Sequence, residues 1–152
     1  MIVRIDNIEE TIGKLNTLTP DTKPLFGMMT PQHMVEHLTM TIKASSGKFP
    51  VLQRSTPEEA DAAKARLIYT DAEIPQGLKS PLMGEGLPEY VHPNLEGAIN
   101  ELKGELEYFE NYYGQNPEAK HIQPRLGPLS HDEWKVFHGK HFKHHFKQFG
   151  LI

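Results

Sequence analysis

The chain has 152 residues, of which 38% are hydrophobic and 24% charged, and this is typical of a globular protein with a single domain, here residues 1–152. Its formal net charge is −4, so nucleic acid is not the expected partner, because domains that bind nucleic acid usually carry a basic excess. It has no cysteine, which excludes disulfides, cysteine-bound zinc, iron–sulfur clusters and a thiol nucleophile on the protein.

Two further properties concern membranes and targeting. No apolar run approaches the roughly 18 residues that a membrane-spanning helix needs. The first residues, MIVRIDNIEE, lack the apolar centre of a signal peptide. We therefore expect a cytoplasmic protein that does not associate with membranes.

The spacing of apolar residues predicts two helices in the first third of the chain. One covers about Ile8–Leu18, where isoleucine and leucine recur at helical spacing. The other begins after Thr30, a favoured N-cap residue, and Pro31 follows it at the first helical position. This helix is expected to end before Gly47, because glycine commonly follows the last residue of a helix.

A shorter helix and a long irregular segment come next. The sequence from Thr56 to Glu59 forms a capping box and predicts a helix up to about Tyr69, which has few apolar residues and should lie at the surface. Residues 71–93 contain four prolines and three glycines, and they are predicted to form a loop. Loops of this length in compact domains are often functional, so we expect this one to cover a binding pocket.

Two more helices are predicted in the rest of the chain. One begins at Asn94 and ends near Gly114, and the last begins at a capping box formed by Ser130 and Glu133. Residues 115–129 between them are expected to form a loop, since no alternating pattern indicates a strand. The predicted fold is therefore all-α, a four-helix bundle with a long crossover loop, in which facing helices build the site.

The last predicted helix carries the most informative pattern. A rotation of about 100° per residue places His138, His141 and His145 within roughly 60° of arc, whereas His144 is turned toward the surface. Trp134 and several phenylalanines share the stripe of the three histidines, and lysines lie mostly on the other side. Imidazoles on a core-facing side need partners, and a transition metal is the commonest reason for several neutral imidazoles to converge.

A second pair of histidines supports a metal site. His33 and His37 lie four positions apart on one face of the second predicted helix, as His141 and His145 do on the last. A pair with this spacing can bind one metal ion. We predict that His37, His141 and His145 are metal ligands and that His138 is a nearby catalytic base or an alternative ligand. A single histidine on an apolar face is more often an ordinary core residue, and this alternative stays open for His33 and His138.

Other chemistries fit the sequence less well. A carboxylate-bridged di-iron bundle needs Glu-x-x-His on its helices, and the match of Glu118 with His121 lies in a predicted loop. The G-x-S-x-G motif of serine hydrolases, the P-loop and the G-x-G-x-x-G motif are absent from the sequence. Neither a serine nucleophile nor a phosphate-binding loop is therefore predicted.

Two segments resemble the DinB-like (YfiT-like) family of metal-dependent enzymes. They read MTPQHMVEHLTMT, residues 29–41, and HGKHFKHHFKQFG, residues 138–150. The family pattern has one histidine in the second helix and a His-x-x-x-His pair in the last helix. In this sequence those positions match His37, His141 and His145.

The match to the family's closing motif is incomplete. That motif usually reads His-His-Arg-Gly-Gln, whereas this chain has Phe146-Lys147 in place of Arg-Gly before Gln148. Residues 127–134 are similar to a GPL-S-x-x-EW segment of an uncharacterised subfamily. The resemblance implies a four-helix bundle, a zinc or nickel ion held by three histidines, and often a homodimer. Relatives include S-transferases that use a low-molecular-weight thiol as cosubstrate, and maleylpyruvate isomerase.

Two functional hypotheses follow. In the first, the protein is a metal-dependent enzyme, a thiol S-transferase or a hydrolase, that acts on a small-molecule substrate. Three imidazoles leave open coordination positions, where bound water reaches a pKa of about 7 or a thiol binds as thiolate. In the second hypothesis, the protein is a non-catalytic helical bundle that a metal stabilises or that forms an oligomer. A fourth protein ligand would favour the second hypothesis.

Overall fold

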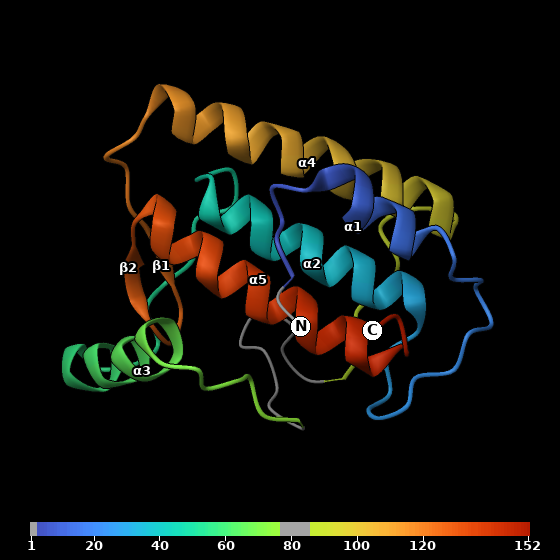
Figure 1. Ribbon diagram of the computed structural model, residues 1–152, viewed down its shortest axis with the longest axis horizontal. Coiled ribbons are helices and arrows are strands. Elements are labelled where there is room, and N and C mark those ends of the chain that lie inside the picture. The colour runs from blue at the N-terminus through green and yellow to red at the C-terminus, as the bar shows by residue number, and fades with distance from the viewer. Residues whose placement is uncertain (1–2, 77–85) are drawn as a thin grey trace.

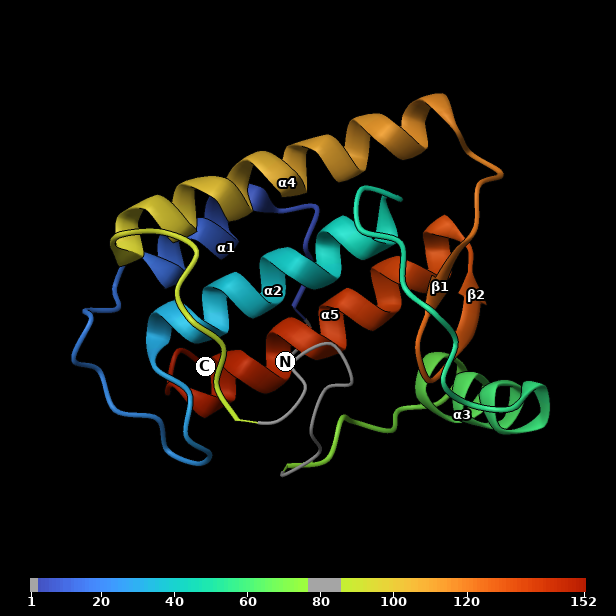
Figure 2. The same cartoon turned by 180° about the vertical axis from the view of Figure 1, so that it is seen from behind.

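Five helices and one short hairpin form the described part of the protein, residues 3–76 and 86–152 of a computed structural model. The elements in chain order are α1 (Ile8–Leu15), α2 (Pro31–Ser45), α3 (Pro57–Tyr69), α4 (Leu95–Gln115), β1 (His121–Gln123), β2 (Gly127–Leu129) and α5 (His131–Gln148). Helix α2 lies between α4 and α5, and α1 packs on α4 (Figure 1). Seen from behind, α3 and the hairpin lie together at one end of α5 (Figure 2). The protein is thus mostly helical.

The core is made by one apolar face from each of α1, α2, α4 and α5. Its largest fully buried side chains are Leu15, Met34, Leu38, Ile42, Leu102, Leu106, Phe109, Tyr113, Leu129, Trp134, Phe142 and Phe146. Burial of large apolar side chains is the main stabilising contribution to a fold of this kind. The same packing holds α2 against α5, the two helices that carry the predicted metal ligands. Within the described ranges, no helix has both the length and the apolar character to span a bilayer.

The predicted helix starts are confirmed. The side chains of Thr30, Thr56 and Ser130 each accept a hydrogen bond from the backbone N–H three residues later. The carboxylates of Glu59 and Glu133 in turn accept from the N–H of Thr56 and Ser130 and complete two capping boxes. Each such cap stabilises its helix by about 1 kcal/mol, so these starts are encoded within a single turn of sequence.

The first helix is shorter than predicted. It ends at Leu15 rather than at Leu18. Beyond it the backbone makes tighter bonds, from Thr17 N–H to the Lys14 carbonyl and from Leu18 N–H to the Leu15 carbonyl. The Thr17 hydroxyl also donates to the Lys14 carbonyl, at 2.7 Å, and this bond favours a turn over continued helix. Leu18 nevertheless packs into the core.

The predicted helical fold is confirmed as a mostly-α fold, whereas the prediction of a loop throughout residues 115–129 is wrong. This segment contains the antiparallel hairpin of β1 and β2. In its turn the Gln123 side-chain oxygen accepts from the N–H groups of Arg125 and Leu126, and Gly127 has a φ of 75° that favours glycine. Strands of three residues are too short to show an alternating pattern, so the sequence did not reveal them.

Helix α3 lies mostly at the surface, as expected from its composition, although its Ile68 belongs to the core. Only Ala60 and Ile68 of its residues are buried. Its C-terminal end is held by Lys140 of α5, whose ammonium donates to the backbone carbonyls of Thr70 and Ala72, each at 2.7 Å. A cation is stabilising at this end of a helix, because the last carbonyls carry partial negative charge. Lys140 therefore ties the segment that follows α3 to the outer face of α5.

Candidate metal centre

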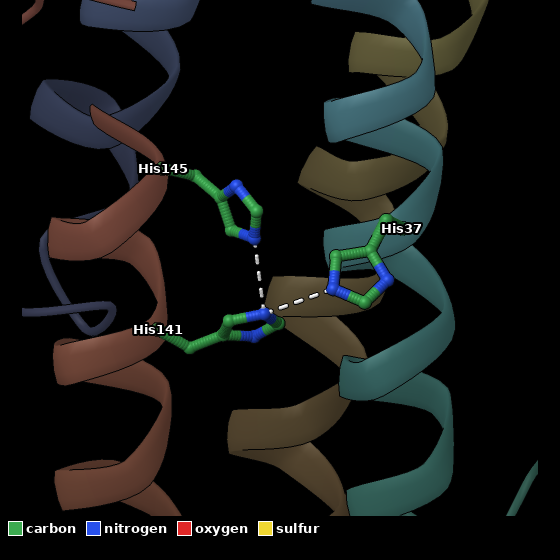
Figure 3. A group of neighbouring side chains, drawn as sticks. All are labelled: His37, His141 and His145. Atoms are coloured by element: carbon green, nitrogen blue, oxygen red, sulfur yellow. Dashed lines mark hydrogen bonds between the residues drawn. The ribbon is translucent and has the colours of Figure 1, made fainter. Parts of the chain in front are cut away.

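The side chains of His37, His141 and His145 converge between α2 and α5 (Figure 3). The Nε2 atom of His141 lies 3.0 Å from that of His37 and 3.2 Å from that of His145. One ring nitrogen from each residue lies within 4.8 Å of the others. Nitrogens bound to zinc at 2.0–2.1 Å in a tetrahedral site lie about 3.3 Å apart. The three side chains are therefore close enough to hold one metal ion, and the predicted convergence is confirmed.

Helical geometry and core packing together produce this convergence. His141 and His145 are one turn apart on α5, and their ring centroids lie 4.8 Å apart. The His37 ring approaches from α2 and meets them edge-on, with centroids 4.8 Å from His141 and 5.2 Å from His145. Phe137 packs against the His141 ring at 5.4 Å. These contacts restrict the rotation of the rings, so their nitrogens are held near the common point.

Gln148 orients the imidazole of His145. The Gln148 amide nitrogen donates to the carbonyl of Phe26 at 3.1 Å, which leaves its oxygen to accept a bond. That oxygen lies 2.7 Å from Nδ1 of His145, so Nδ1 carries the proton and donates. The Nε2 atom of His145 therefore presents a lone pair to His37 and His141. A ligating histidine usually donates its other ring N–H in this way.

The other two rings have weaker partners at Nδ1. Nδ1 of His141 lies 3.5 Å from the hydroxyl of Thr41, whose own proton is donated to the carbonyl of Leu38. Nδ1 of His37 is buried and has no hydrogen-bond partner among the described residues. The two short contacts join Nε2 of His141 to Nε2 of His37 and to Nε2 of His145, and the last of these atoms bears no proton. With neutral imidazoles, at most one of the two contacts can therefore be an ordinary hydrogen bond. A cation that accepts all three lone pairs would satisfy every Nε2 atom.

All three imidazoles are in the neutral form that binds metals. Their exposed fractions are 5% for His37, 7% for His141 and 5% for His145. Burial lowers the pKa of His37 to about 3 and the pKa of His145 to about 4. Burial and the neighbouring imidazoles lower the pKa of His141 well below its ordinary value. A buried ring is uncharged at neutral pH because the apolar surroundings disfavour the imidazolium ion.

His138 does not belong to this group. Its Nε2 lies 2.8 Å from the hydroxyl of Ser45, which donates its own proton to the Ile42 carbonyl at 2.6 Å. His138 therefore donates from Nε2, and its buried Nδ1 has no partner in the described ranges. Its ring stacks on Trp134, with centroids 5.1 Å apart, and burial lowers its pKa to about 3. The role of His138 as a catalytic base stays a prediction.

Two other histidines have packing roles outside the group. His33 occupies the third position of α2, where Nδ1 lies 2.9 Å from the Thr30 hydroxyl and Nε2 lies 3.0 Å from the Pro88 carbonyl. It completes the capping box of α2, in agreement with the alternative that it is an ordinary structural residue. His144 is half-buried rather than exposed, because the ring of Phe26 packs against it at 5.4 Å.

Glu36 holds the chain that leads into α4 against α2. Its carboxylate accepts from the backbone N–H of Val91 at 2.8 Å and of His92 at 2.9 Å. This contact fixes one flank of the predicted loop on α2, through a residue that precedes His37 in the sequence but is turned about 100° away from it around the helix. Residues 77–85 of that loop lie outside the described residues, so the expectation that it covers the site stays a prediction.

Gln148 and Glu36 were not among the predicted site residues. The signal for Gln148 was present, since it follows His145 by three positions on a helix, and such pairs are neighbours. Glu36 had no comparable signal, because its partners are backbone groups 55 and 56 positions away. Contacts of that kind depend on how the chain returns to α2.

No family model, curated protein or solved structure matches this chain significantly. The fold and the site define a mostly helical protein with a buried group of three histidines able to hold a metal ion.

Proposed function

We propose that His37, His141 and His145 bind one divalent metal ion, zinc or nickel, in a four-helix bundle of the DinB-like type. The observation that carries this proposal is the approach of three buried, neutral imidazoles to a common point through Nε2. Imidazole suits both metals. The hydrogen bond from His145 to Gln148 supports the assignment, because it points the free lone pair toward the other two rings.

The proposed ion is catalytic, in an enzyme that acts on a small molecule as a thiol S-transferase or a hydrolase. Catalytic zinc sites usually have three protein ligands, whereas structural sites have four. Among the described residues the group has three members, and neither His33 nor His138 joins it. A metal held there can lower the pKa of bound water to about 7 or hold a thiol as thiolate. Because the chain has no cysteine, that thiol would come from a bound small molecule.

A second candidate function is structural. The three histidines are at most 7% exposed, and a site this well buried also suits a metal that only stabilises the bundle. In that case the bundle would be non-catalytic, and its role would be in an oligomer, of which a homodimer is the simplest form. Sedimentation of the metal-loaded and metal-free protein would reveal such an assembly.

Metal analysis tests the first step. Protein purified without a metal-affinity column and dialysed against trace zinc and nickel should retain close to one equivalent of metal per chain, measured by mass spectrometry of the digested sample. The His141→Ala variant should retain almost none, and the His144→Ala variant should retain the wild-type amount. Equal retention by the two variants would show that the metal binds elsewhere.

Cobalt substitution separates the two candidate functions. The visible absorption of Co²⁺ reports its ligands, so a small thiol that enters an open position should change the spectrum of the cobalt-loaded protein. A spectrum that does not respond to thiols would favour the structural function. A screen that pairs thiols with electrophiles, and a parallel screen with ester and amide substrates, would then distinguish a transferase from a hydrolase, with His141→Ala as the inactive control.

A further inference from the structure

A groove of about 1040 Å³ runs along the outer face of α5, and none of the three proposed metal ligands lines it. Its floor is α5, and its walls are residues 3–6 on one side and residues 68–76 on the other. We propose that this groove binds a low-molecular-weight amphipathic anion, a molecule with an apolar body and one acidic group. The inference goes beyond the proposed metal function and does not depend on it.

The shape of the groove depends on Gly139. The chain before α1 extends toward α5 (Figure 1), and a Cβ added to Gly139 would lie only 2.7 Å from the carbonyl oxygen of Val3. This close approach brings the wall of residues 3–6 onto the helix. The lining positions on α5 extend from Asp132 to Lys147, which corresponds to about 22 Å of helix. The volume is near the upper end of the range for small-molecule sites.

The middle of the groove is apolar. Ile5 and Ile68 contribute side chains that also belong to the core, and Val136 adds to the lining there, while Ile74 lines the groove beside His144. Val136 is 38% exposed, so its methyl groups are accessible from the groove. An apolar ligand gains affinity by covering such a surface, by about fourfold for each buried methylene group. This lining calls for a ligand with an extended hydrocarbon or aromatic body.

The end of the groove near the C-terminus of α5 has an excess of positive charge. Lys143 and Lys147 share one carboxylate, that of Glu73, at 2.6 Å and 3.3 Å. Lys140 lines the groove one turn before Lys143, near the middle of α5, with Asp71 as the other acidic side chain of this half. Three ammonium groups therefore meet two carboxylates. An acidic group on the ligand would neutralise the remaining charge, and Lys147 is accessible because its side chain is 45% exposed.

The opposite end carries no such excess. There Arg4 forms an ion pair with Asp6 at 2.8 Å, and Lys135 and Asp132 contribute one charge of each sign. The groove is therefore electrostatically asymmetric, and the ligand should bind with its acidic group near Lys147 and its apolar body near Val136.

Dodecanoate, used below its micelle concentration, is a suitable probe, and dodecyltrimethylammonium is its matched cation. Isothermal titration should show dodecanoate binding at least tenfold more tightly than the cation. Lys147→Gln should weaken dodecanoate binding about fivefold, whereas Lys103→Gln on α4, outside the groove, should not. Val136→Trp should obstruct the apolar part of the groove and weaken dodecanoate binding at least tenfold, whereas Tyr108→Trp, at an equally exposed position of α4, should leave binding intact.

Equal affinity for the anion and the cation would overturn the proposal, as would equal losses in the groove variants and their controls. Loss of dodecanoate binding in His141→Ala, together with normal binding in Val136→Trp, would place the ligand at the metal centre and also overturn it. Because binding is measured on metal-free and metal-loaded protein, failure of the metal proposal leaves this test valid. Circular dichroism spectra of Val136→Trp establish that it is folded, and Lys147→Gln tests the same site through an exposed side chain.

Discussion

The Nε2 atoms of His37 and His141 lie 3.0 Å apart, although 104 positions separate the two residues in the sequence. Packing of α2 against α5 produces this contact, and Gln148 directs the lone pair of His145 toward the same point. The proposed ligands are therefore arranged by the fold itself. The unfolded chain has no such arrangement, so a metal that binds here binds the folded state and stabilises it.

The first prediction concerns thermal stability. Zinc at about 100 times its dissociation constant stabilises the folded state by about 2.7 kcal/mol, which corresponds to a rise in Tm of roughly 5–10 °C for a domain of this size. Differential scanning calorimetry should show this rise for the wild type and for His144→Ala, and its reversal by a chelator. His141→Ala should show no rise, and an equal response of the two variants would contradict the assignment.

The second prediction concerns Gln148. Its replacement by alanine removes the acceptor that orients His145, and metal affinity should fall by about 10- to 100-fold. Gln32→Ala is the matched control, because Gln32 is also a buried glutamine but contacts Glu36 and the backbone of His92 instead. Competition with a fluorescent chelator measures both variants. Gln148→Glu, which can still accept from His145, should keep more affinity than Gln148→Ala.

The third prediction concerns the pH dependence of metal binding. Burial lowers the pKa of His37 to about 3 and of His145 to about 4, so protons should compete with the metal only well below pH 5.5. Affinity measured by titration calorimetry should therefore change little between pH 7.5 and 5.5. Three exposed imidazoles with an ordinary pKa of about 6.5 would lose close to 1000-fold in affinity over the same range. A loss of that size would show that the rings are protonated like exposed histidines.

The fourth prediction concerns His138. Burial depresses its pKa to about 3 in the folded state, below the ordinary value of 6.5. Below pH 6.5 the unfolded chain binds a proton at His138 that the folded protein does not bind. The corresponding part of the free energy of unfolding is therefore fully present above pH 6.5 and is lost as the pH falls from 6.5 toward 3. Between pH 7 and 5.5 this loss amounts to about 1 kcal/mol. Urea unfolding of the metal-loaded protein should show that His138→Phe removes this part of the pH dependence.

The same variant also tests the role of His138. Phenylalanine can keep the stacking on Trp134, and the Ser45 hydroxyl keeps its bond to the Ile42 carbonyl. His138→Phe should therefore leave metal affinity unchanged and stability at pH 7 equal or higher, since an unpartnered buried nitrogen is removed. A large loss of metal affinity would instead make His138 a ligand, and a loss of turnover alone would support its role as a base.

The fifth prediction concerns Glu36. Glu36→Ala removes the acceptor of the Val91 and His92 N–H groups, and unfolding free energy should fall by about 0.5–1.5 kcal/mol, because water can replace the acceptor at the exposed Val91. Glu107→Ala, at an exposed position of α4, should change it by less than about 0.5 kcal/mol. Hydrogen exchange followed by mass spectrometry should show faster exchange in the peptide that contains Val91 and His92. Unchanged exchange there would show that Glu36 does not hold this segment.

Several features could be predicted from sequence because their causes are local. The starts of α2, α3 and α5 depend on Thr30, Thr56 and Ser130, each of which acts within one turn. The stripe of histidines on α5 follows from the helical repeat alone. The hairpin was missed for the opposite reason, since three-residue strands have too little pattern to detect and depend on a turn around Gln123 and Gly127.

The candidate metal centre itself required the tertiary structure. A helical repeat indicates which face an imidazole occupies, but not the partner that its nitrogens meet on another helix. His138 and His141 share a stripe, yet one donates to Ser45, 93 positions away, and the other faces His37. The axial position of α2 along α5 decides between these partners, and that position follows from the packing of many core side chains at once.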